Sequence, residues 1–122
     1  MRAQRFQCRL IGALLILGGT THAAGADSPP GYAAGRAVYE KWCAPCHDSG
    51  VIHPGTHALM TKYAGGARAS GLITQWNDLP ASYVTFMVRH GMSVMPQFRK
   101  TEISDSELAA LAAYLARNTP GH

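Results

Sequence analysis

The sequence predicts a small all-α domain, and three observations support this fold class. Apolar residues recur at spacings of three and four in the stretches 32–41, 81–90 and 105–117. A capping box, Ser104-Asp105-Ser106-Glu107, opens the last of these stretches. No stretch alternates apolar and polar residues with the period of two that marks a half-buried strand. The length of 122 residues leaves room for one folded domain.

Residues 1–26 have the features of an export signal. Three arginines precede the apolar run 10–17, which is too short to span a bilayer, and Ala24-Gly25-Ala26 is a small-residue cleavage site. We therefore expect a signal peptide over 1–26, a folded domain over 27–122 and a location in the bacterial periplasm.

The charge of the whole chain overstates that of the expected domain. Three of the eleven Lys and Arg residues lie in the signal segment, whereas none of the seven Asp and Glu residues does, so the domain carries a net charge of +1. Nothing in this balance indicates nucleic acid or an anionic membrane as a partner, and we expect no stable membrane anchor.

The first predicted helix spans about 32–41 and contains a glycine at position 35. Glycine inside a helix costs up to about 1 kcal/mol relative to alanine, so Gly35 calls for a packing reason, such as a close helix crossing. From 48 to 76 the pattern is weak and glycine-rich, and we expect a long loop with a short helix around 57–63. So long a loop needs a surface to pack on.

The next predicted helix is bounded by Gly91 after its last turn, and Asp78 is a candidate N-cap, with Pro80 in the first turn. Four residues share one of its faces, and we expect that face to pack on the core: Tyr83, Phe86, Met87 and His90. Met60 and Met87, both in predicted helices, are expected core residues.

The run Cys43-Ala44-Pro45-Cys46-His47 is the attachment sequence of a c-type haem. Its spacing lets two thiols reach the two vinyl groups on one edge of a porphyrin while the adjacent imidazole ligates the iron. A thioredoxin-like redox pair is one alternative, but a helix rather than a buried strand precedes the motif. A zinc site is another, although the third cysteine, Cys8, leaves with the signal.

A haem ligated by His47 needs a second axial ligand or keeps an open site. Met95 is the candidate, because it lies in a loop that Pro96 keeps out of a helix. Met92 is the nearest rival, and three histidines are further possibilities: His53, His57 and His90. A His/Met pair raises the reduction potential and fills both axial sites, which suits electron transfer.

The sequence resembles the class I cytochromes c from Gly35 to Leu115. Gly35 and Tyr39 correspond to the glycine and aromatic residue of the family's first helix, and Leu111 with Tyr114 to the residues of the last helix that cross it. The resemblance implies helices wrapped around one covalently attached haem, with the N- and C-terminal helices crossing. It also implies that the Pro54 carbonyl accepts a hydrogen bond from His47, and that Trp76 or Arg68 serves the haem propionates.

The stretches 78–80, 88–91 and 95–104 are similar to small monohaem cytochromes that accept electrons within periplasmic flavoprotein dehydrogenases, such as p-cresol methylhydroxylase. The resemblance implies a one-electron carrier and no enzyme. The resemblance implies a dehydrogenase as its electron donor, such as a flavoprotein that oxidises phenols or alcohols, and a downstream cytochrome or oxidase of the respiratory chain as its acceptor. The alternatives are a haem enzyme or gas sensor with an open sixth site, and a thioredoxin-like thiol oxidoreductase.

Overall fold

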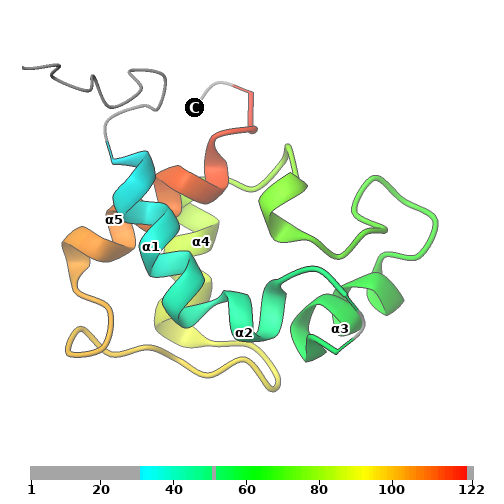
Figure 1. Ribbon diagram of the computed structural model, residues 1–122, viewed down its shortest axis with the longest axis horizontal. Helices are drawn as coiled ribbons and strands as arrows, with labels where there is room; N and C mark the ends of the chain where they lie inside the picture. Colours follow the sequence, from blue (N-terminus) through cyan, green and yellow to red (C-terminus); the bar gives the residue numbers. More distant parts are fainter. Residues whose placement is uncertain (1–30, 51, 121–122) are drawn as a thin grey trace, which may run out of the picture.

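The computed structural model describes residues 31–50 and 52–120, and these residues form a helical domain (Figure 1). The elements, in chain order, are α1 (Tyr32–Trp42), α2 (Ala44–His47), α3 (Pro54–Lys62), the 3-10 turn η1 (Ile73–Gln75), α4 (Ala81–His90) and α5 (Asp105–Ala116). Within the described ranges the β structure consists of one isolated bridge. The predicted all-α class is confirmed. The predicted signal peptide lies outside the described residues and stays a prediction. No helix in the described part is long and apolar enough to cross a membrane.

Helix α1 crosses α5 (Figure 1), which confirms the helix crossing expected from the glycine at position 35. A Cβ atom on Gly35 would lie 2.7 Å from the Cβ atom of Tyr114 and would overlap the carbonyl oxygen of Ala110. The ring of Tyr114 then meets two tyrosines of α1, with centroid distances of 5.1 Å to Tyr32 and 5.8 Å to Tyr39. The crossing therefore requires a residue without a side chain in α1.

Helix α4 packs against α5 through a different face from the one predicted. Val84 and Val88 are buried, whereas Tyr83 is 42% exposed and Phe86 is 53% exposed, so the expected core face is wrong. The helix carries two apolar stripes, and the smaller β-branched one faces α5 while the Phe86 ring stacks on His90 at 4.3 Å. The predicted core position of Met60 is also wrong, because Met60 is 36% exposed.

The two predicted caps have different outcomes. The capping box of α5 is confirmed: the Ser104 hydroxyl accepts from the Glu107 amide at 3.2 Å, and the Glu107 carboxylate accepts from the Ser104 amide at 2.8 Å. The N-cap of α4 is Pro80 and not Asp78. The Asp78 carboxylate is bound instead by Arg68, ten residues upstream.

Helix α3 and the following segment to residue 80 lie beside the α1–α4–α5 group (Figure 1). The C-terminal residues tie this segment to α5. The Thr119 hydroxyl accepts from the Leu79 amide at 2.9 Å, and the Arg117 guanidinium donates to the Thr74 carbonyl at 2.9 Å. The weakly patterned loop predicted for 48–76 is thus held by α3, by η1 and by contacts from the end of the chain. The short helix predicted there begins earlier than expected, at Pro54.

Candidate functional site

The attachment motif lies at the junction of α1 and α2. Cys43 caps the C-terminus of α1 and is buried, whereas Cys46 in the single turn of α2 is exposed. The buried Tyr39 hydroxyl donates to the His47 carbonyl at 2.7 Å and so fastens α2 to α1. The two thiols are therefore presented on a short turn whose position depends on the first helix.

An apolar cavity opens beside this turn, and it contains four of the six predicted site residues: Cys43, His47, Trp76 and Met95. The remaining lining residues are mostly apolar: Leu59, Lys62, Tyr63, Ile73, Leu79, Tyr83, Val84, Met87, Val88, Met92, Leu111 and Leu115. Besides the motif, the lining side chains come from α3, η1, α4, α5 and the loops between them, so the cavity lies where α3, α4 and α5 meet the attachment motif. Cys46 and Pro54 are outside it, and so are the rival histidines His53, His57 and His90.

The cavity is narrow relative to a porphyrin. Its volume is about 130 Å³, and pockets that enclose whole small-molecule ligands measure roughly 300–1,000 Å³. Met92 and Tyr83, which are 48% and 42% exposed, lie among the lining residues.

The His47 imidazole is in the chemical state that a metal ligand needs. Burial lowers its pKa, so the ring is neutral at physiological pH and has a free nitrogen lone pair. Its Nδ1 atom is buried and has no hydrogen-bond partner among the described residues, so the bond implied for the Pro54 carbonyl is not formed. Gly55 packs against the ring instead: a Cβ there would lie 2.7 Å from His47 Cε1.

The protonation of Cys43 argues against a thioredoxin-like pair. Burial raises the pKa of the Cys43 thiol to about 12. A thiol-disulfide catalyst requires the opposite, a cysteine whose pKa is lowered so that the thiolate can attack. The zinc alternative finds no support either, because no group of three metal-binding side chains occurs in the described part of the chain.

Met95 reaches the cavity from a loop that is fixed at both ends. The loop follows Gly91, whose φ of +70° suits glycine, and returns to α4 where the Phe98 amide donates to the Val88 carbonyl at 2.8 Å. Arg89 holds the returning chain by donating to the carbonyls of Phe98 at 3.0 Å and Ile103 at 2.9 Å. Met95 and His47 thus line the same cavity, although they lie far apart in the sequence.

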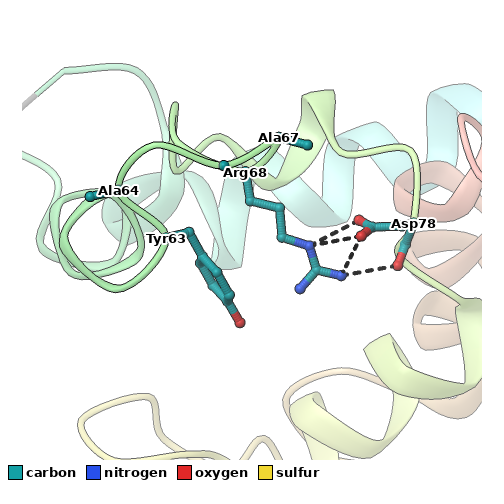
Figure 2. Close-up of a pocket in the computed structure, with 6 residues that line it drawn as sticks. Tyr63, Ala64, Ala67, Arg68 and Asp78 are labelled. Atoms are coloured by element: carbon teal, nitrogen blue, oxygen red, sulfur yellow. Dashed lines mark hydrogen bonds and ion pairs between the residues drawn. The ribbon is translucent and has the colours of Figure 1, made fainter.

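Trp76 lines the cavity with an unpartnered donor. The residue is 5% exposed, and its indole Nε1 is buried without a hydrogen-bond partner among the described residues. Arg68 stacks on the ring, with its Cζ atom 4.5 Å from the ring centroid. As Figure 2 shows, the Arg68 guanidinium is bound to the Asp78 carboxylate, with Tyr63 beside it. Arg68 therefore supports Trp76, and its charge is already paired.

Three residues of the site were not singled out from the sequence in the roles that the structure gives them. Tyr39 bonds to the His47 carbonyl, and Thr56, 1% exposed, donates to the Asp48 carbonyl at 2.9 Å. Among the described residues, Lys62 is the one charged side chain that lines the cavity. A threonine two residues after a helix-starting proline was the available signal for Thr56. The other two depend on tertiary contacts that no local pattern encodes.

The residues present fit a covalently attached haem. The cavity combines an apolar lining, one buried thiol, a neutral imidazole and a thioether, and the second thiol lies exposed on the same turn as the imidazole. Thioether and imidazole are axial ligands that haem iron takes in electron-transfer proteins. A buried indole N–H without a partner adds a donor suited to an anionic ring substituent.

Comparison with known proteins places the chain among cytochromes c. Residues 30–115 match the family model described as cytochrome c oxidase, cbb3-type, subunit III. The chain is 26% identical over 105 residues to the cytochrome c subunit of 4-cresol dehydrogenase [hydroxylating] from Pseudomonas putida. The aligned region covers 86% of this chain and 78% of the relative. Among solved structures it is similar to cytochrome c6 from the diatom Phaeodactylum tricornutum, with a TM-score of 0.45 and 28% identity over 70% of this chain and 91% of that one.

Proposed function

The chain belongs to the cytochrome c family described as cytochrome c oxidase, cbb3-type, subunit III, and from this premise we propose that it is a periplasmic electron carrier with His47 and Met95 as axial ligands. It is a class I monohaem cytochrome that carries one haem c and serves as an electron-transfer protein, not an enzyme. The haem supplies an Fe(III)/Fe(II) couple. In this proposal Cys43 and Cys46 form the two thioethers.

One observation carries the assignment of the ligands: a single cavity gathers Cys43, His47 and Met95. The neutral His47 ring offers its nitrogen, and Met95 approaches from a loop on another part of the chain. When both axial positions are filled, dioxygen or peroxide finds no open site, so this pair favours electron transfer over the enzyme and sensor alternatives. Replacing a nitrogen ligand with a thioether also raises the reduction potential.

Trp76 and Pro54 are proposed to support the haem in different ways. We assign the Trp76 indole Nε1 to a haem propionate, because an unpartnered buried donor costs about 1–3 kcal/mol unless a ligand satisfies it. Arg68 stacks on the indole ring and is itself held by the Asp78 carboxylate, so it keeps the indole in place. Pro54 acts indirectly: as the first residue of α3 it fixes where the helix begins, and the next residue, Gly55, then lies against the His47 ring.

The proposed electron donor is a periplasmic dehydrogenase. The similarity to a cytochrome subunit of 4-cresol dehydrogenase supports this class of partner, and we propose a flavoprotein that oxidises phenols or alcohols. The chain then passes each electron to a downstream cytochrome or oxidase of the respiratory chain. Export by residues 1–26 places the cysteines outside the cytoplasm, where c-type haem is attached in bacteria.

Haem attachment is tested on protein exported together with the haem-maturation machinery. The chain is denatured, extracted with acidic acetone, and examined by its pyridine haemochrome spectrum. We expect the haem to stay with the wild-type chain and to be extracted from any haem-containing Cys43→Ala/Cys46→Ala protein. A colourless wild-type chain, or haem released into the acetone, contradicts the assignment of both cysteines.

The donor is tested by mixing the ferric holo-protein without oxygen with a phenol-oxidising flavoprotein dehydrogenase and its substrate. We expect rapid reduction of the haem in each turnover. A His/Met cytochrome c of similar potential from an unrelated pathway serves as control. If this control is reduced equally fast, the proposed partner class loses its support, whereas the assignment of the haem ligands is unaffected.

A further inference from the structure

Met92 and Met95 face the same cavity from one tight hairpin. The Met92 amide donates to the Met95 carbonyl at 3.1 Å, and the Met95 amide donates to the Met92 carbonyl at 2.9 Å. Residues that exchange both hydrogen bonds in this way are directly opposite each other, with side chains on the same side of the ladder. Both methionine side chains accordingly line the cavity that contains His47.

The turn between the two methionines has an uncommon backbone conformation. Ser93 has a φ of +54° and is the one non-glycine residue with positive φ in the described ranges. Positive φ at the first central residue alone is the pattern of a type II′ hairpin turn, which serine adopts only at some cost. Gly91 closes the base of the hairpin, where a Cβ would lie 2.6 Å from the Met95 carbonyl oxygen. The hairpin therefore fixes the backbones of Met92 and Met95 relative to each other.

We propose that Met92 is a reserve axial ligand, able to bind the haem iron when Met95 cannot. This inference rests on the proposed ligation by His47 and Met95. In the exchange one iron–sulfur bond breaks and another forms, with no change in electrons or protons. The order of preference follows from burial: Met95 is partly buried against the core and followed by Pro96, whereas Met92 is 48% exposed.

Met87 provides a matched control. It is a third methionine that lines the same cavity, but it lies within α4 and takes no part in the hairpin. If any nearby thioether could replace Met95, Met87 and Met92 would be equivalent. The hairpin geometry predicts that they are not.

The experiment uses the holo-protein with methyl-labelled methionine and compares four variants: Met92→Ala, Met95→Ala, Met92→Ala/Met95→Ala and Met87→Ala/Met95→Ala. Axial methionine is detected by the weak far-red band of the ferric state and by its strongly shifted methyl resonance in the ferrous state. Affinity for added imidazole, which must displace the bound thioether, provides an independent readout.

We expect Met92→Ala to retain the wild-type band and methyl resonance. Met95→Ala should keep the far-red band and show a new shifted methyl resonance, and Met87→Ala/Met95→Ala should do the same. Met92→Ala/Met95→Ala should lose both signals. Imidazole should bind about ten-fold or more weakly to Met95→Ala than to the double variant lacking both hairpin methionines, because the tethered thioether competes at high effective concentration.

Loss of the band in Met95→Ala to the same extent as in Met92→Ala/Met95→Ala overturns the reserve role while leaving Met95 as the ligand. Persistence of the band only when Met87 is present assigns the rescue to Met87 and overturns it as well. An unchanged methyl resonance in Met95→Ala, or its loss in Met92→Ala, instead contradicts the ligation by Met95 on which the inference rests. The two failures are therefore distinguishable.

Discussion

Replacing Gly35 with alanine tests whether the α1–α5 crossing is as close as the structure shows. The added Cβ would lie 2.7 Å from the Cβ atom of Tyr114 and would overlap the Ala110 carbonyl oxygen. Overpacking a buried site costs about 1–3 kcal/mol, and the upper part of this range applies because a helix carbonyl cannot rotate away. Alanine regains about 1 kcal/mol in helix propensity. We expect a net loss of about 2 kcal/mol in the free energy of unfolding, which lowers Tm by about 8–16 °C.

The assay is guanidinium unfolding of the ferric holo-protein, followed by far-ultraviolet circular dichroism. Gly66→Ala is the matched control, because a Cβ there would lie 3.6 Å from the nearest atom, the Tyr63 carbonyl oxygen, and Gly66 does not have positive φ. That control should be neutral or gain up to about 1 kcal/mol through a less flexible unfolded chain. A Gly35→Ala protein as stable as wild type would refute the close crossing.

Three further predictions concern the supports of the site. Arg89→Leu should lose about 2–4 kcal/mol in denaturant unfolding, because two backbone carbonyls lose a partly buried donor, whereas Arg36→Leu on the exposed face of α1 should unfold like wild type. Tyr39→Phe should lose about 1 kcal/mol and shift the reduction potential, measured by redox titration, because the hydrogen bond to the His47 carbonyl disappears. The pKa of Glu107 lies below its ordinary value because its carboxylate accepts hydrogen bonds in the capping box. Its stabilising effect is therefore present above the unfolded-state pKa and is lost as pH falls through the folded-state value, so Glu107→Gln should flatten the fall of unfolding free energy below about pH 4.

The elements that were predicted from sequence are those encoded by local patterns. Helix α4 occupies the predicted residues, and the capping box of α5 forms as its four residues indicated. The face of α4 was not predictable, since two apolar stripes compete and only the position of α5 selects Val84 and Val88. Asp78 likewise had the right chemistry for an N-cap, but Arg68 binds it across ten residues of irregular chain.

The candidate site likewise has one part that local sequence encodes and one part that depends on the folded backbone. The attachment motif is contiguous, so its three residues could be read directly, and the proline after Met95 marked the loop of the proposed second ligand. The pairing of Met92 with Met95 depends on a two-residue turn in which serine has positive φ, a conformation that local sequence favours only when glycine or asparagine is present. Sequence reasoning consequently ranked these methionines as rivals, whereas the hairpin presents both to one cavity.

Both proposed axial ligands are ultimately supported by α5. His47 is fastened by Tyr39, whose ring meets Tyr114 of α5 at 5.8 Å. The methionine loop returns at Phe98, and Arg89 bonds there while also binding the first turn of α5 through the Asp105 carboxylate at 2.9 Å. A shift of α5 relative to α1 therefore displaces the imidazole side and the thioether side together. Because the crossing fixes the relation between the two sides, the close contact that excludes a side chain at position 35 is also a condition for holding both ligands on one iron.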